Sequence, residues 1–249
     1  MNFHETFQRI FGIVGITCTI IFFSGCGGVT AMYKVSAVIP NESYKTVGWE
    51  TVKISVPDLA IHIRSSNNFF LGSGFETFPL LGIESFEKAK EPFFYSTYYL
   101  KYDPQKGWVE KWPIGTLPPY FYVEILFDPK ENGYTFDPKN TILIMKNKNI
   151  SASAFLAPEG FFWSGDAYLM TLFPHDTLEK YLDHEQVVSE NFQLRSNERR
   201  GFAIKFGVQP PEPGDDFAVK IEGLKRFGKP VDLPLVRYHG SKEIKQVHY

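Results

Sequence analysis

Residues 120–129 read YFYVEILFDP, and this stretch decides the expected fold. Every second position is apolar, namely Phe121, Val123, Ile125 and Phe127. Because successive side chains of a strand point to opposite faces, a period of two predicts a strand with one face in a core. Aromatic and β-branched residues favour such a pleated surface. The following Asp128-Pro129 predicts a turn, since proline fixes φ and lacks an N–H for the ladder.

The same alternation recurs along the chain. We expect further strands over residues 51–56, 59–64, 141–145, 192–194, 201–208, 216–224 and 231–238. Turns rich in Pro, Gly, Asn and Asp separate them, and three of these turns share an aromatic-Asp-Pro form: Tyr102-Asp103-Pro104, Phe127-Asp128-Pro129 and Phe136-Asp137-Pro138. Short strands at near-regular spacing favour an all-β fold, an antiparallel β-sandwich.

Two segments depart from the strand pattern. In residues 176–188, Leu178, Tyr181 and Leu182 have helical spacing, which predicts one short helix. Residues 72–92 contain Gly72, Gly74 and Pro79 and predict a long irregular loop. From residue 191 onward, the four expected strands resemble an immunoglobulin-like or fibronectin-like arrangement, although the paired cysteines of antibody domains are missing.

Composition limits the classes of partner and the means of stabilisation. The formal charge is −2, so there is no cationic surplus to neutralise phosphates, and we do not expect nucleic acid as a partner. Cys18 and Cys26 are the only cysteines, and Cys18 lies in a segment that we expect to be removed. Core packing must therefore stabilise the body, expected over residues 33–245, either as one domain or as halves 33–150 and 151–245.

The N-terminus carries an export pattern. Arg9 precedes residues 10–23, an apolar run without charge, and small residues follow. Such a segment is typical of a secretory signal, and its 14 positions are fewer than the roughly 20 that a membrane-spanning helix needs. The run ends in Phe23-Ser24-Gly25-Cys26. Small residues allow an extended backbone to enter a peptidase, and the thiol of Cys26 is a nucleophile.

These four residues resemble the lipobox of bacterial lipoproteins, although Phe23 stands where that family usually has Leu. The resemblance covers residues 1–26. It implies cleavage before Cys26, acylation of its thiol with fatty acids such as palmitate, and a lipidated tether over residues 26–32. The protein would then be held at a membrane of the cell envelope. Because Gly27 differs from the Asp that retains such proteins at the inner membrane, the outer membrane is favoured in a Gram-negative cell.

The sequence contains few arrangements that suggest chemistry. Neither a Gly-x-Ser-x-Gly elbow nor a phosphate loop nor a His-Glu-x-x-His pair occurs, so we expect no cofactor and no metal. The densest group of possible ligands is His175, Asp176, Asp183, His184 and Glu185, which we interpret as the polar face of the short helix. The carboxylate pairs Asp215-Asp216 and Glu110 with Glu124 could serve acid–base chemistry on a glycan, but a turn explains the first more simply. His62, His239 and His248 are expected to be exposed and inert.

The 24 Phe and 13 Tyr residues are expected to lie mainly in the core. The best candidate for an exposed aromatic patch is Phe161, Phe162 and Trp163, because Pro158 and two glycines flank them.

The sequence thus predicts a non-enzymatic, lipid-anchored binding or structural module. The alternative is an envelope enzyme that acts on a glycan or peptide. A third hypothesis, a subunit of a larger secretion or assembly complex, would require a large apolar patch or an unpaired edge strand.

Overall fold

The computed structural model describes residues 28–47, 51–65, 67, 69–76, 84–94, 100–103, 105, 107–110, 117–157 and 185–248. The chain divides into two compact units: a larger one of residues 34–69 and 93–244, and a smaller one of residues 1–33, 70–92 and 245–249. Within the described ranges the regular structure is all strand, apart from one 3-10 turn, η2 (Pro138–Asn140). In those ranges, no helix has the length and apolar character needed to span a bilayer.

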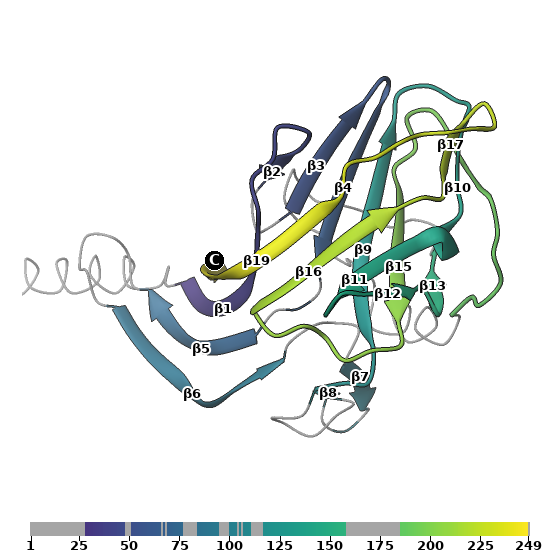
Figure 1. The fold of residues 1–249 in the computed structure, drawn as a ribbon. Coiled ribbons are helices and arrows are strands. Elements are labelled where there is room, and N and C mark those ends of the chain that lie inside the picture. The colour runs from purple at the N-terminus through teal and green to yellow at the C-terminus, as the bar shows by residue number, and fades with distance from the viewer. Residues whose placement is uncertain are drawn as a thin grey trace, which may run out of the picture. The chain divides into compact units, whose positions relative to one another are not determined.

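A six-stranded antiparallel sheet forms one side of the larger unit (Figure 1). Its strands, in spatial order, are β13 (Ala154–Leu156), β15 (Arg200–Phe206), β9 (Phe121–Pro129), β4 (Leu59–Ser65), β3 (Thr51–Val56) and β2 (Lys45–Val47). Strand β9 lies at the centre, where it pairs with β15 on one side and with β4 on the other. The stretch YFYVEILFDP therefore has strand neighbours on both edges.

A second large sheet has the order β12-β11-β16-β19-β1 in the larger unit, to which β19 contributes residues 236–244 and β1 residues 34–38. Its strands are β12 (Lys148–Ser151), β11 (Thr141–Met145), β16 (Gly214–Ile221), β19 (Val236–His248) and β1 (Gly28–Val38). In the smaller unit, β1 is followed in the sheet order by β5 (Phe69–Glu76) and β6 (Glu84–Phe94). These neighbours make β16 and β19 interior strands of the sheet.

Two smaller sheets complete the described structure. The first has the order β14 (Phe192–Leu194), β10 (Tyr134–Phe136), β17 (Leu224–Arg226) and β18 (Lys229–Pro230). The second is the hairpin of β7 (Leu100–Asp103) and β8 (Gly107–Glu110). The expected all-β, antiparallel class is confirmed. In both large sheets, a strand that precedes residue 150 pairs with one that follows it: β9 with β15, and β11 with β16. The expected domain limits stay predictions.

Three local predictions need correction. Residues 231–235 are not a strand, since β19 begins at Val236; Pro230 and Pro234 lack the N–H groups that a ladder needs. The expected loop 72–92 contains the end of β5 and most of β6. Of the expected helix 176–188, residues 185–188 are described and are not helical, because the backbone of Gln186 pairs with Phe155 through two 2.9 Å hydrogen bonds. The rest of that segment lies outside the described residues.

Aromatic side chains join the three larger sheets into one core. Phe121 of β9 and Phe217 of β16 meet edge to face, with ring centroids 5.9 Å apart. Phe136 of β10 lies 4.7 Å from Phe127 and 5.0 Å from Phe202 between ring centroids. All five rings belong to the same buried cluster. For these residues the expectation that the aromatics form a core is confirmed.

Strand β9 is buried on both faces, whereas its alternation predicted a half-buried strand. Tyr122, Glu124 and Leu126 are all buried on the face opposite the main core. Glu124 is 1% exposed and pairs with Arg64, which is directly opposite on β4: Arg64 Nε donates to Glu124 Oε2 at 2.7 Å and Nη2 to Oε1 at 3.3 Å. This two-point contact satisfies a carboxylate that would otherwise be costly to bury.

The aromatic-Asp-Pro turn at Asp137 fixes the small sheet to the core. The carboxylate of Asp137 accepts hydrogen bonds from the backbone N–H of Lys139 at 3.1 Å, from Asn140 Nδ2 at 3.0 Å and from Ser189 Oγ. Its backbone N–H donates to the carbonyl of Gly223 at 3.1 Å. A Cβ on Gly223 would lie 2.1 Å from the Asp137 carbonyl oxygen, so only glycine permits this approach.

Candidate functional site

A β-bulge on β16 is the starting point of the candidate site. Gly214 pairs with Gly240 of β19, but Phe217 pairs with Tyr238, so β16 has one residue more than its partner in this interval. Gly214 and Gly240 have φ values of 123° and 75°, which side chains rarely allow. Bulges bend a strand and redirect its side chains, and they are common beside functional sites.

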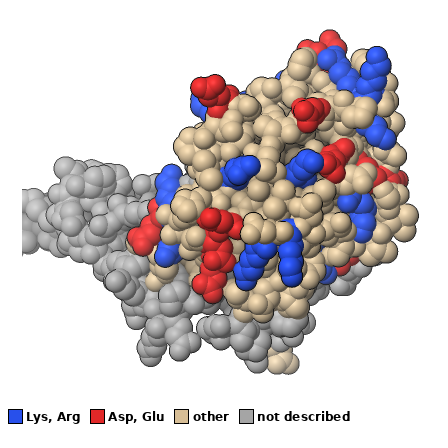
Figure 2. All heavy atoms as spheres, in the orientation of Figure 1, with Lys and Arg blue, Asp and Glu red and all other residues tan. Residues whose placement is uncertain are grey.

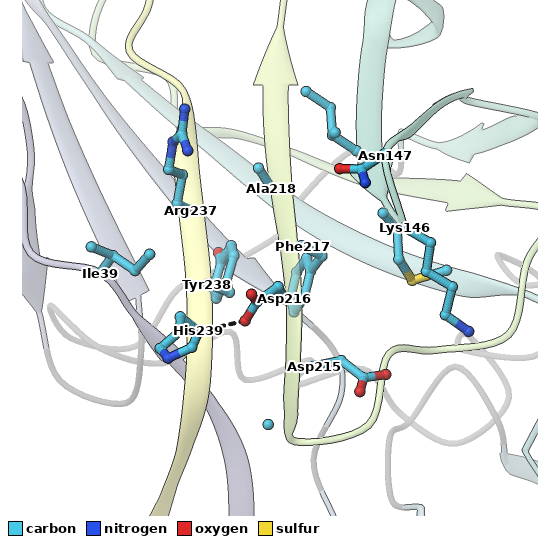
Figure 3. Close-up of a pocket in the computed structure, with 13 residues that line it drawn as sticks. Ile39, Lys146, Asn147, Asp215, Asp216, Phe217, Ala218, Arg237, Tyr238 and His239 are labelled. Carbon is cyan, nitrogen blue, oxygen red and sulfur yellow. Dashed lines mark hydrogen bonds and ion pairs between the residues drawn. The ribbon is translucent and has the colours of Figure 1, made fainter.

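The bulge separates the two adjacent carboxylates. Asp215 closes a turn, because its carboxylate accepts from the backbone N–H of Glu212 at 3.1 Å. A turn over residues 212–215 is present as expected, but both acids already lie in β16 and not before it. Asp216 instead points to β19, where its Oδ1 contacts His239 Nδ1 (Figure 3). The two carboxylates therefore have different partners and do not form an acid–base pair.

The bulge opens onto a trough of about 610 Å³. Its floor follows a row across three strands, since Ala218 of β16 pairs with Ile144 of β11 and with Arg237 of β19. Ile39 lies beside this row, because its backbone N–H donates to the carbonyl of Arg237 at 2.9 Å. Figure 3 shows Ile39, Arg237 and His239 on one side of β16 and Lys146 on the other. The trough thus combines a short apolar floor with charged walls.

Two cations of the trough have no ion-pair partner. The side chains of Arg237 and Lys146 are exposed, and neither forms an ion pair or a side-chain hydrogen bond within the described structure. Lys146 and Asn147, with φ values of 51° and 58°, form the tight turn between β11 and β12. Some other cations of the larger unit are paired with carboxylates, as Arg64 is with Glu124 and Lys205 with Glu185 at 2.7 Å. The trough therefore offers free positive charge for an anionic group.

The chemistry that the trough could support depends on the Asp216–His239 contact and on the other lining residues. The contact with Asp216 orients His239, which is the arrangement of a general base and its orienting group. However, the described residues that line the trough include no Ser, Thr or Cys to act as a nucleophile. Asp216 and His239 are 74% and 68% exposed, so water competes for both groups. An anion beside Arg237 and an apolar group over Ala218 and Ile144 would match the lining.

Charges elsewhere on the larger unit are mixed in sign. Figure 2 shows Lys and Arg side chains interspersed with Asp and Glu on the visible face. Within the described ranges, no group of three or more His, Cys, Asp or Glu side chains is placed to hold a metal ion.

Several residues singled out from the sequence lie outside the described residues: Cys26, Phe161, Phe162, Trp163, His175, Asp176, Asp183 and His184. Glu185 is described and accepts hydrogen bonds from Tyr122 and from Lys205. Glu124 pairs with Arg64. His62 is buried, which corrects the expectation that it is exposed. His239 is exposed as expected, but its contact with Asp216 was missed because it depends on strand pairing.

Comparison with protein-family models, with curated proteins and with solved structures finds no match to this chain.

Proposed function

We propose that this chain is an exported, lipid-anchored protein of the bacterial cell envelope, whose body is a non-enzymatic binding module. The observation that carries the proposal is Phe23-Ser24-Gly25-Cys26 at the end of an uncharged apolar run. Acylation of the Cys26 thiol would hold the body at a membrane, since two or three acyl chains make a stable anchor. The outer membrane is the proposed location in a Gram-negative cell.

The described architecture supports a binding module. The two large antiparallel sheets contribute side chains to one core, as in a β-sandwich, with Phe121 against Phe217 as the contact between them. Such folds commonly bind ligands with loops and sheet faces set on a rigid core. A closer likeness to immunoglobulin-like domains in the C-terminal half stays part of the proposal.

The trough is the proposed binding site. Its free cations, Arg237 and Lys146, and its apolar floor support a ligand that carries a carboxylate or phosphate beside an apolar group. The exposed Asp216–His239 pair is the feature that favours the rival, an envelope enzyme acting on a glycan or peptide. A nucleophile supplied by the substrate or by water would be needed in that case.

Metabolic labelling with radioactive palmitate tests the anchor. The full-length protein should become labelled and should sediment with membranes, and Cys26→Ser should lose the label. Cys18→Ser is the matched control, because Cys18 lies within the apolar run and should leave labelling unchanged. An unlabelled wild-type protein, or equal labelling of Cys26→Ser, would refute the anchor.

Site-specific crosslinking tests the trough. Ile39 is partly exposed and lines the trough, so a photoreactive residue at this position should capture the ligand in native membranes. Arg237→Glu should abolish the adduct, whereas Lys148→Glu, on β12 outside the lining, should preserve it. An adduct that is unaffected by Arg237→Glu would contradict the proposed site. Substrate turnover that disappears in His239→Ala would favour the enzyme.

A further inference from the structure

The turn between β17 and β18 contains a residue that does not suit its backbone. Arg226 pairs with Lys229, so Phe227 and Gly228 form a two-residue turn. Their φ values are 48° and 78°, both in the left-handed region. Turns of this kind favour Asn-Gly, since a bulky side chain at positive φ is strained. Formation of the turn therefore does not by itself account for a phenylalanine at position 227.

Neighbouring residues hold this turn in place. The backbone N–H of Phe227 donates to the carbonyl of Gly133 at 2.7 Å. Arg226 Nη2 contacts Asp58 Oδ2 at 2.9 Å and Glu131 Oε2 at 3.2 Å. The Arg226 guanidinium carbon also lies 5.7 Å from the centroid of the Phe227 ring. These contacts fix the turn before any partner arrives, so little ordering entropy remains to be lost on binding.

The Phe227 ring covers one side of Gly133 but stays largely in solvent. A Cβ on Gly133 would lie 2.3 Å from a ring carbon, so the ring rests directly on the glycine backbone. Even so, Phe227 is 73% exposed, the highest value among the large apolar residues of the described ranges. Lys225 and Lys229 flank it on the two strands and form no ion pair within the described structure. The tip thus presents one aromatic ring between two free cations.

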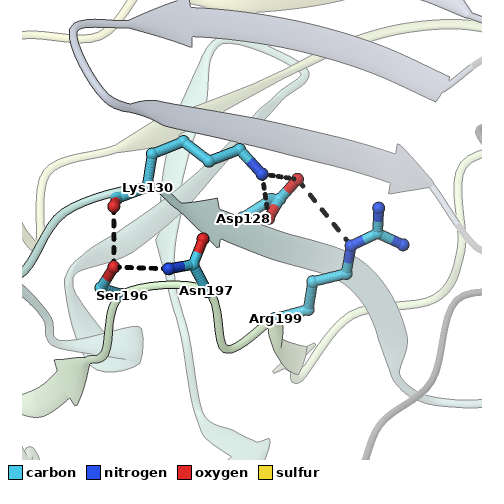
Figure 4. Close-up of polar contacts among 5 residues, drawn as sticks. All are labelled: Asp128, Lys130, Ser196, Asn197 and Arg199. Carbon is cyan, nitrogen blue, oxygen red and sulfur yellow. Dashed lines mark hydrogen bonds and ion pairs between the residues drawn. The ribbon is translucent and has the colours of Figure 1, made fainter.

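The turn at residues 195–199 packs beside this end of the larger unit. Ser196 Oγ donates to the carbonyl of Lys130 at 2.7 Å, while Lys130 Nζ and Arg199 Nε contact the Asp128 carboxylate at 3.1 and 3.8 Å (Figure 4). The backbone N–H of Ser196 also donates to Asn132 Oδ1 at 2.8 Å. The acids near the tip are therefore already in contact with cations. Asp128 contacts Lys130 and Arg199, and both Asp58 and Glu131 contact Arg226.

We propose that this tip, Lys225 to Lys229, is a second membrane contact that places the Phe227 ring between anionic lipid headgroups. The inference rests on the proposed anchor, which would keep the tip close to a lipid surface. Aromatic rings favour the membrane–water interface, and an anionic surface attracts nearby lysines. The free lysines supply the charge complementarity, and the exposed ring supplies the apolar part.

The size of the tip favours a lipid surface over a protein partner. A stable protein interface buries about 800 Å² on each side, with several anchor residues at its centre. One ring and two lysines fall far short of that. For a tethered body a weak contact suffices, because the tether replaces free encounter with a high local concentration. We expect loss of the ring to weaken the contact about tenfold and loss of each lysine to weaken it about fivefold.

The test uses the full-length protein reconstituted in vesicles. One set of vesicles contains phosphatidylcholine alone, and the other also contains about 30 mol% phosphatidylglycerol, which makes the surface anionic. A photoreactive phenylalanine analogue replaces Phe227, and in a matched control it replaces Val188, which is 72% exposed. We expect lipid adducts at position 227 in anionic vesicles, and few at position 188. Lys225→Glu with Lys229→Glu should remove them, and Lys148→Glu should not.

A second measurement separates membrane contact from a purely structural role. Acetylation of Lys229 by a water-soluble reagent should slow in anionic vesicles, and Phe227→Asn should abolish that protection while leaving the denaturation midpoint unchanged or higher. Equal lipid adducts at positions 227 and 188, protein adducts at 227 in native membranes, or unaltered protection in Phe227→Asn would each overturn the proposal. Palmitate labelling and sedimentation report on the Cys26 anchor, whereas adducts at position 227 report on the tip, so failure of the tip and failure of the anchor are distinguishable.

Discussion

Gly223→Ala is expected to destabilise the protein strongly. The added Cβ would lie 2.1 Å from the carbonyl oxygen and 2.9 Å from the carbonyl carbon of Asp137, where about 3.4 Å is comfortable. Both contacts are backbone atoms, so no side-chain rotation relieves them. The backbone at Gly223, just after the end of β16, must therefore move away from the Asp137 turn.

The magnitude follows from what that movement breaks. The hydrogen bonds from Asp137 N to Gly223 O (3.1 Å) and from Glu222 N to Asn140 O (2.9 Å) join the two segments. Each contributes about 0.5–1.5 kcal/mol, and overpacking adds about 1–3 kcal/mol. We therefore expect a loss of about 2–6 kcal/mol in the free energy of unfolding. With a urea m-value of about 2 kcal/mol/M, the midpoint should fall by about 1–3 M.

Urea denaturation followed by tryptophan fluorescence is the assay, and Gly207→Ala is the matched control. Gly207 has no atom within 4 Å of an added Cβ and no positive φ. Its substitution should be neutral or stabilise the protein by up to about 1 kcal/mol, because alanine restricts the unfolded chain. A Gly223→Ala midpoint within about 0.3 M of the wild type would refute the close approach.

Three further predictions concern buried polar groups. Arg64→Met should cost about 3–5 kcal/mol in urea denaturation, since it leaves the Glu124 carboxylate buried without its partner; a loss below about 1 kcal/mol would contradict this. Thr141→Val should leave stability unchanged or raise the thermal midpoint, because the buried Thr141 hydroxyl has no hydrogen-bond partner within the described structure; a clear drop would show a missed contact. Burial raises the pKa of Tyr134 above its ordinary value, with Asp58 and Glu131 adding to the rise and Arg226 opposing it. The folded state therefore holds this proton more tightly, so stability should fall as pH rises above about 10, and less so in Tyr134→Phe.

Local pattern was sufficient for most strands of the larger unit. The alternation in residues 51–56, 59–64, 141–145 and 201–208 corresponds to β3, β4, β11 and β15, the last of which ends at Phe206. These strands have one face in the main core, so the period of two is visible in their composition. Proline and glycine marked some turns correctly, including the cap at Asp137. At Asp128-Pro129, where a turn was expected, β9 instead continues and pairs with β4.

The missed elements have long-range causes. Glu124 looked like the polar face of a half-buried strand, but Arg64, 60 positions away in sequence, makes its burial tolerable. Strands β5 and β6 lie in a segment whose glycines and proline predicted a loop. Their regular structure depends on neighbouring strands, which outweigh a weak local preference.

The trough was unpredictable for the same reason. Asp216 and His239 are 23 positions apart and were interpreted separately, one as a turn residue and the other as an inert residue near the chain end. They meet because β16 pairs with β19 and carries an extra residue before Phe217. A bulge of this kind follows from the register of two strands, which the sequence of either strand alone does not specify.

The mass of the mature N-terminal peptide, recovered from membrane-extracted protein, tests the proposed anchor most directly. We expect a peptide that begins at Cys26 and carries acyl chains on that residue. A peptide that begins at another position, or one with an unmodified Cys26 thiol, would contradict the account.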